Sequence, residues 1–225
     1  MFDNAERKLE RLNSGIEDNI STQTYNIIIG AMIVYGLLVN AIIVAKFADV
    51  FVNMNPIALI VGYFVCCIAG TVIAHRSNNP AMSFLGYSLV VLPIGALMST
   101  FVPSYYVQDI KSAALVTGVI VIVMTGVATA KPQWFSGLGT TLFISLILGL
   151  VGQLIAMLLG YAGNIFNWFF VIIFSLYVGY DWMKAQAYPK TVDNAIDSSL
   201  DIYLDIINLF IRLLAIFGGR GRSRR

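Results

Sequence analysis

Seven apolar segments of about 20 residues follow one another along the chain, with short polar stretches between them. A helix of about 20 residues crosses a ~30 Å hydrocarbon core, and strand-type alternation of polar and apolar positions is absent. Because helices satisfy their own backbone hydrogen bonds in lipid, we expect an all-α integral membrane protein with seven transmembrane helices. The expected spans are residues 25–47, 56–75, 81–100, 112–130, 137–160, 165–184 and 195–217.

The polar stretches between the spans contain turn residues and are short. Pro103, Pro132 and Pro189 each lie in one of them, as expected for segments that end a helix. No extramembrane domain fits between the spans. We therefore expect three regions, namely a polar N-terminal segment 1–24, a seven-helix membrane domain 25–217 and a basic tail 218–225.

The composition agrees with a membrane protein and excludes several other classes. Hydrophobic residues make up 58% of the chain and charged residues 12%, about half the charged share of a globular protein. The net charge of +2 is too small to indicate a nucleic-acid partner. The two cysteines, Cys66 and Cys67, provide too few ligands for a metal site or a disulfide framework. We expect no resident cofactor.

Lysine and arginine are distributed unevenly between the two sides of the expected membrane domain. With a cytosolic N-terminus, the inner side carries Arg7, Lys8, Arg11, Arg76, Lys131, Lys184 and Lys190, and the outer side carries Lys46 and Lys111. The positive-inside rule therefore predicts a cytosolic N-terminus. The four arginines of the tail 218–225 disagree with this orientation if the seventh segment crosses the membrane. Either that segment only re-enters, or its basic tail is tolerated outside.

The seventh segment differs from the others because it carries a polar stripe. Asp197, Asp201, Asp205, Asn208 and Arg212 fall within about 80° of one another at ~100° per residue. A charge at the centre of a bilayer costs several kcal/mol, so this stripe should face protein or water rather than lipid. The segment is therefore expected inside the helix bundle.

Two other interpretations of this segment stay open. Asp197 follows Asn194 by three residues, which is the spacing of a capping pair at a helix N-terminus. The whole segment is also compatible with an amphipathic helix on the membrane surface. Asp205 fits neither interpretation well, because it lies about 15 Å along the helix from Ala195.

The sixth segment supplies a second intramembrane carboxylate, Asp181. A short loop joins the sixth and seventh segments, so their helices must be neighbours, and Asp181 lies about one turn shallower than Asp205. Two carboxylates in a low dielectric cannot both ionise cheaply and titrate as a unit. We expect Asp181 and Asp205 to form a proton-sensitive switch. Alternatively, Asp181 lies at the membrane interface and pairs with Lys184, three residues on.

Three further polar residues lie in the apolar segments and receive no functional role. His75 is the one histidine of the chain, and we interpret it as a neighbour of lipid headgroups. Gln153 and Asn167 are uncharged and need one hydrogen-bond partner each.

The last two segments resemble a known family. The stretch SLDIYLDIINLF at 199–210, followed by Arg212, is similar to the C-terminal signature of the transmembrane Bax inhibitor motif family. The stretch FSLY at 174–177, with Tyr180 and Asp181, resembles the family's sixth-helix motif. The resemblance implies six helices around a central seventh. For bacterial members it implies a pH-sensitive calcium leak channel in the inner membrane.

The resemblance also implies roles for individual residues. Asp181 and Asp205 match the family's paired aspartates, which share a proton and hold the pore, and both are candidate ligands for a calcium ion. Arg76 is the candidate for an arginine that latches the second helix against the seventh. Asp201, Asn208 and Arg212 are expected to face the pore. Asp201 departs from the family pattern, and a third carboxylate should make deprotonation of the set harder.

Other functions are compatible with buried carboxylates. An intramembrane aspartyl protease also places one aspartate on each of two late helices, but Asp205 follows Tyr203 and Leu204 rather than a Gly-x-Gly turn. We therefore expect no enzyme. A proton-coupled transporter and a non-conducting membrane interaction protein remain alternatives. The sequence leaves the oligomeric state open.

Overall fold

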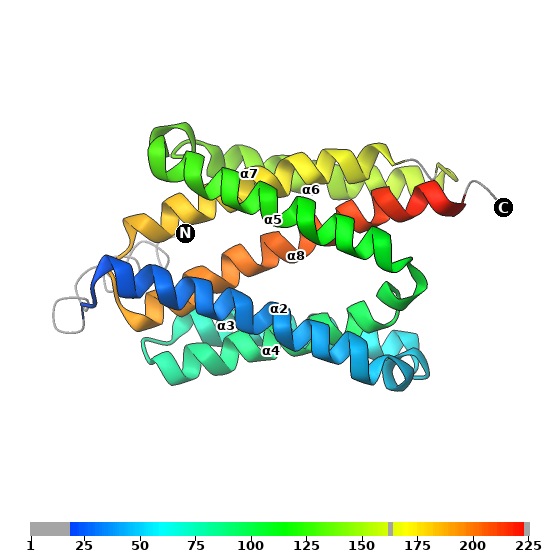
Figure 1. The fold of residues 1–225 in the computed structure, drawn as a ribbon, viewed down its shortest axis with the longest axis horizontal. Coiled ribbons are helices and arrows are strands. Elements are labelled where there is room, and N and C mark those ends of the chain that lie inside the picture. Colours follow the sequence, from blue (N-terminus) through cyan, green and yellow to red (C-terminus); the bar gives the residue numbers. More distant parts are fainter. Residues whose placement is uncertain (1–18, 162–163, 223–225) are drawn as a thin grey trace. The chain divides into compact units, whose positions relative to one another are not determined.

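The computed structural model describes residues 19–161 and 164–222, and these residues form helices and short connections without any strand (Figure 1). The expected all-α fold is confirmed. The helices of the described residues are α2 Thr22–Val52, α3 Pro56–Arg76, α4 Pro80–Ser99, α5 Val107–Ala130, α6 Leu138–Leu158, α7 Ile165–Ala187 and α8 Val192–Arg222, with short 3-10 helices η1 Val102–Ser104 and η2 Pro132–Trp134.

Helices α3 and α4 begin where the sequence provides a capping side chain. Asn55 precedes Pro56, and its side-chain oxygen accepts hydrogen bonds from the amides of Ile57 and Ala58 at 2.9 and 3.2 Å. Asn79 precedes Pro80 in the same way. Proline at the first helical position has no amide proton to satisfy, so an Asn-Pro pair starts a helix at a defined residue.

Helix ends differ from the expected spans because hydrophobicity marks the apolar part of a helix and not its last hydrogen bond. α5 begins at Val107 rather than at residue 112, and α2 is longer than residues 25–47 at both ends. α8 begins at Val192 and continues to Arg222, so most of the expected tail 218–225 is helical. Residues 1–18 of the expected polar N-terminal segment lie outside the described residues.

The chain divides into two compact units. Of the described residues, the first unit contains 19–104 and 187–201, and the second contains 105–161, 164–186 and 202–222. The first unit therefore contains α2, α3, α4 and the first turns of α8. Within it, α4 packs against both α2 and α3. The second unit contains α5, α6, α7 and the remaining turns of α8.

Six of the described helices, α2 to α7, are long and apolar enough to cross a membrane. They expose many large apolar side chains, such as Ile57 of α3 and Ile122 of α5, which suits contact with lipid. Among its described side chains, α8 has no large exposed apolar residue. This agrees with a helix that does not face lipid. Two expectations stay predictions, namely that α8 crosses the whole membrane and that the other six helices surround it.

Candidate functional site

The polar face of α8 contains four aspartates at a regular spacing of four residues. They are Asp193, Asp197, Asp201 and Asp205. Four residues turn a helix by about 400°, so neighbouring members of the series lie on nearly the same side. Asp193, Asp197 and Asp205 are buried, and Asp201 is partly buried. Asp193 was missed from the sequence because it precedes the expected start of the seventh segment.

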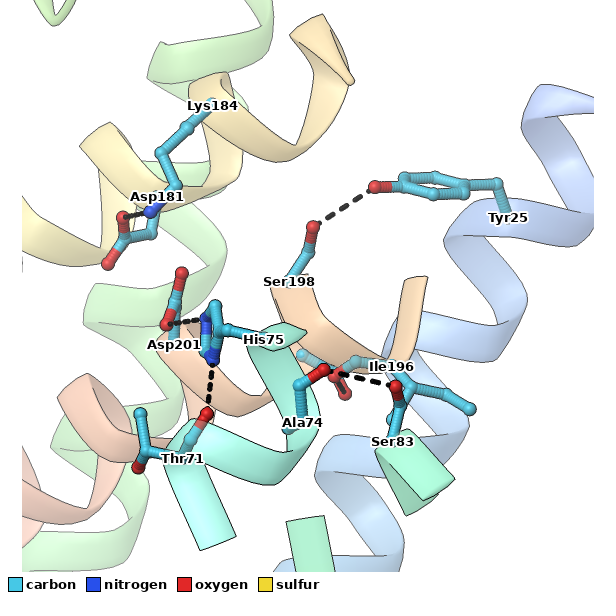
Figure 2. A network of polar contacts seen from close by, with 11 residues as sticks. Tyr25, Thr71, Ala74, His75, Ser83, Asp181, Lys184, Ile196, Ser198 and Asp201 are labelled. Carbon is cyan, nitrogen blue, oxygen red and sulfur yellow. Dashed lines mark hydrogen bonds and ion pairs between the residues drawn. The ribbon is translucent and has the colours of Figure 1, made fainter. Parts of the chain in front are cut away.

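The start of α8 is fixed by hydrogen bonds to α2 and α4 within the first unit (Figure 2). The Ser83 hydroxyl of α4 donates to Oδ1 of Asp193 at 2.6 Å. The Tyr25 hydroxyl of α2 donates to the Asn194 carbonyl oxygen at 3.3 Å and shares a hydrogen bond with the Ser198 hydroxyl at 3.1 Å. These polar contacts hold the first two turns of α8 together with the burial of Ala195 and Ile196.

Lys190 lies just before α8, outside the candidate spans. Its Nζ is 4.5 Å from the centroid of the Tyr25 ring. Burial lowers the pKa of the Lys190 ammonium, because the charged form loses part of its hydration.

The structure contradicts both alternative interpretations of this helix. The capping oxygen belongs to Thr191, whose hydroxyl accepts a hydrogen bond from the Asn194 amide at 3.2 Å. Asp197 therefore lies inside the helix and is not its cap. The polar face carries buried aspartates, whereas a surface helix would expose them to water.

His75 joins the end of α3 to α8, also within the first unit. Its Nε2 lies 3.1 Å from Oδ1 of Asp201, and its Nδ1 lies 3.1 Å from the carbonyl oxygen of Thr71. The side chains are 32% and 21% exposed for His75 and Asp201, respectively. His75 therefore has a partner on α8 that the sequence did not predict, and its position near lipid headgroups stays a prediction.

Arg76, the expected latch, points elsewhere. It is exposed and forms no ion pair with the described part of the chain. Consecutive residues of a helix point about 100° apart, so His75 and Arg76 do not face the same side of α3. The contact from the end of α3 to α8 is made by His75, and a latch role for Arg76 stays a prediction.

In the second unit, the two residues of the predicted switch, Asp181 and Asp205, lie near the same side chain, that of Tyr177. Asp181 and Asp205 are buried, at 8% and 7% exposed. Both carboxylates act electrostatically on the Tyr177 hydroxyl. Lys184 donates from Nζ to Oδ1 of Asp181 at 3.1 Å, which confirms the pairing that the sequence left open. Asp181 thus has a cationic partner and still lies near the same tyrosine as Asp205.

Further along α8, Arg212 binds to two neutral amides. Its Nη1 donates to Oε1 of Gln153 at 3.1 Å and to Oδ1 of Asn167 at 3.2 Å, and its guanidinium carbon lies 4.1 Å from the centroid of the Phe170 ring. It forms no ion pair with any residue in 19–161 or 164–219. Asn208 donates to the Leu204 carbonyl of its own helix at 2.8 Å. Gln153 and Asn167 were missed as functional partners.

No group of three or more His, Cys, Asp or Glu side chains in the described residues is arranged to hold a metal ion. Asp181 and Asp205 therefore have no third ligand of this kind within that part of the chain. Their role as calcium ligands stays a prediction, and it concerns a transported calcium ion rather than a permanently bound one.

Comparisons with known proteins agree with the sequence motifs. The family model described as "Inhibitor of apoptosis-promoting Bax1" matches residues 17–222. An uncharacterized membrane protein of Streptococcus pyogenes serotype M6 is 31% identical over 155 residues, which cover 64% of this chain and 66% of that protein. The chain thus matches slightly less than two thirds of that relative's length.

Two other relatives have informative names. Bax inhibitor 1 of Schizosaccharomyces pombe is 26% identical over 171 residues, 74% of this chain and 64% of that protein. The inner membrane protein YbhL of Escherichia coli is 25% identical over 234 residues, 95% of this chain and 99% of that protein. With a family model that matches nearly all of its residues, this integral membrane protein belongs to the Bax inhibitor family.

Proposed function

We propose that this chain is a pH-sensitive calcium leak channel whose switch is the carboxylate pair Asp181 and Asp205. The observation that carries the proposal is the burial of both carboxylates in one unit, where both act on Tyr177. Two buried carboxylates that share an environment repel each other when both are ionised. They therefore exchange protons as a coupled pair.

The closed form is the protonated one. Lys184 neutralises one negative charge through its contact with Asp181, and one proton neutralises the other. Loss of this proton leaves an unbalanced buried charge, which is strongly unfavourable unless the helices separate or a cation enters. Either response opens a path for a cation, so the leak should increase as the pH rises.

Calcium suits this arrangement as a transported ion. Ca²⁺ prefers six to eight oxygen ligands, most of them carboxylates, carbonyls or water. Two carboxylates attract the ion without supplying a complete binding site. Weak binding of this kind allows the ion to leave again, which conduction requires.

The decisive experiment is calcium flux into proteoliposomes over a series of pH values. Asp205→Asn should abolish the pH dependence, because the remaining carboxylate, Asp181, is balanced by Lys184 and stays ionised without the shared proton. The matched control is Asp49→Asn, which changes an exposed aspartate of α2 and should leave the pH dependence intact. A normal pH-dependent leak in Asp205→Asn contradicts the proposal. Flux that saturates with substrate indicates a transporter instead, and no flux in any variant indicates an interaction protein.

The proposal places the N-terminus and the loop between α3 and α4 in the cytosol. Its support is the excess of Lys and Arg on that side. Labelling of Asn53→Cys in a Cys66→Ser, Cys67→Ser background tests it. The label should react from the outside only, and reaction from the cytosol alone contradicts the orientation.

A further inference from the structure

Arg212 lies among uncharged partners in the second unit. Its Nη1 donates to Oε1 of Gln153 on α6 at 3.1 Å and to Oδ1 of Asn167 on α7 at 3.2 Å. The guanidinium carbon lies 4.1 Å from the centroid of the Phe170 ring. A charge that is taken out of water is normally paired with an opposite charge, but no carboxylate of residues 19–161 or 164–219 lies within ion-pair distance of Arg212. Side chains of α6 and α7 thus hold this cation in place and leave its charge unbalanced.

Arginine is a donor only, and this fixes how the neighbouring amides are turned. Because the guanidinium has no acceptor, Gln153 and Asn167 present their oxygens to it and turn their NH2 groups away. The NH2 group of Asn167 donates from Nδ2 to Oδ1 of Asn164 at 3.2 Å. Asn164 is therefore turned with its own NH2 group away from Asn167, so each amide of the series directs a donor outward.

This part of the second unit has more donors than its described residues use. A guanidinium has five N–H donors, and those on Nε and Nη2 of Arg212 make no hydrogen bond with the described residues. Nε2 of Gln153 and Nδ2 of Asn164 likewise have no acceptor in 19–161 or 164–219. An excess of donors around one positive charge favours a ligand that supplies negative charge and several acceptor oxygens.

We propose that Arg212, Gln153 and Asn164 form a binding site for a phosphate group, in which Asn167 and Phe170 hold the guanidinium in position. The N–H groups of Nε and Nη2 lie along one edge of the planar guanidinium, and such an edge binds two oxygens of a phosphate in parallel. A carboxylate has two oxygens in all, whereas a phosphate has further oxygens that accept from the NH2 groups of Gln153 and Asn164.

The site lies where a phosphate can reach it. Asn167 is in the first turn of α7, so the guanidinium that it binds lies near the beginning of that helix. Arg212 and Gln153 are half-buried, and Asn164 is exposed. Nδ2 of Asn164 lies beside the exposed Gly219, 3.3 Å from the position of a Cβ on that glycine.

Two sources of phosphate fit this position. The beginning of a membrane-spanning helix lies at the depth of the lipid headgroups, whose phosphates are negatively charged. Soluble phosphate reaches the same depth from the water. The N-terminal end of α7 adds partial positive charge, which favours an anion from either source.

Binding of inorganic phosphate tests the site in the full-length protein, purified in a non-ionic detergent. The ³¹P resonance of the phosphate should broaden when the protein is added, and Arg212→Gln should remove the broadening. Arg212→Lys keeps the charge but not the planar pair of donors, and it should weaken binding about tenfold. The control is Arg76→Gln, which removes an exposed arginine of α3 and should leave the broadening intact.

Gln153→Glu is a sharper variant because it changes the charge of the site without changing its size. The new carboxylate still accepts from Nη1 of Arg212, so the guanidinium keeps its place, but its charge is now balanced. Phosphate binding should weaken about tenfold or more, while the unfolding temperature should not fall. Loss of binding together with a lower unfolding temperature is distinguished from this outcome by the same pair of measurements, and it assigns Gln153 to stability and overturns its place in the site.

Lipid phosphate is tested with vesicles of equal parts phosphatidylglycerol and phosphatidylcholine. The protein is reconstituted, extracted again in detergent and analysed by native mass spectrometry. Retained phosphatidylglycerol that is lost in Gln153→Glu and kept in Arg76→Gln identifies the lipid as the source, and broadening by inorganic phosphate identifies soluble phosphate. Either result supports the site.

Two results overturn the proposal. One is the absence of binding in both assays, and the other is binding that Arg212→Gln and Gln153→Glu leave unchanged. Neither assay measures calcium, so the site is decided independently of the proposed function.

Discussion

Gly70 of α3 and Gly86 of α4 bring the backbones of their helices into direct contact. A Cβ on Gly86 would lie 2.6 Å from the carbonyl oxygen of Gly70, and a Cβ on Gly70 would lie 2.6 Å from the carbonyl oxygen of Gly86. Small residues allow such close crossings of membrane helices. The crossing fixes the position of α3 beside α4 only five residues before His75, and so it helps to position the imidazole against Asp201.

Gly86→Ala should therefore lower the thermal stability of the purified protein. The added methyl group meets backbone atoms that cannot move aside, and overpacking of this kind costs about 1–3 kcal/mol. Thermal unfolding in detergent measures the effect. The control is Gly62→Ala on α3, where nothing lies within 4 Å of the added Cβ and stability should be unchanged or slightly higher. Equal losses in both variants contradict the close crossing.

Ser83→Ala should destabilise the protein by about 1–3 kcal/mol. The substitution removes the hydroxyl that donates to Asp193 at 2.6 Å, and a buried carboxylate that loses a donor is poorly solvated. Ser104→Ala removes an exposed hydroxyl and should cost much less. Chemical unfolding of both variants provides the comparison, and similar losses show that the buried contact adds little.

The contact between Asp181 and Lys184 should contribute measurable coupling in a double-mutant cycle. Asp181→Asn, Lys184→Gln and the double variant should give a coupling energy of about 1 kcal/mol or more in unfolding experiments, because the carboxylate is nearly buried. Lys46 and Asp49 have the same spacing on α2 but are exposed. Their cycle should give less than about 0.5 kcal/mol. Equal coupling in the two cycles contradicts a specific role for Lys184.

Arg212→Gln should raise calcium leak at every pH tested. Arg212 lies about 10 Å along α8 from Asp205 and on the same side of the helix, so its fixed charge repels a cation near the switch. The amides of Gln153 and Asn167 bind the guanidinium without neutralising it. Arg212→Lys keeps the charge and should keep the leak low. Equal leak in the two variants contradicts an electrostatic barrier.

The helices and the polar character of α8 were predictable from the sequence, because both depend on local patterns. Asn-Pro pairs mark where α3 and α4 begin, and the spacing of Asp197, Asp201 and Asp205 identifies one polar face. The choice between His75 and Arg76 was not predictable in this way. Charge favours the arginine, but the rotation of α3 about its axis decides which side chain faces a residue 126 positions away.

The sequence contains an indication that Arg212 has polar partners in neighbouring helices. An arginine in an apolar helix needs acceptors, and the residue one turn before it is an asparagine rather than an acid. Gln153 and Asn167 are uncharged polar residues in neighbouring apolar segments, and their amide oxygens are suitable acceptors. Gln153 and Asn167 lie 59 and 45 residues from Arg212 in the sequence, so local patterns could not show that they contact it.

Asp193 and Asp201 attach the first turns of α8 to two different helices of the first unit. Ser83 of α4 donates to Asp193, and His75 of α3 contacts Asp201. The two aspartates are eight residues apart, which is about 12 Å along the helix. Contacts with two helices at points this far apart oppose rotation of these turns about their axis as well as sliding along it.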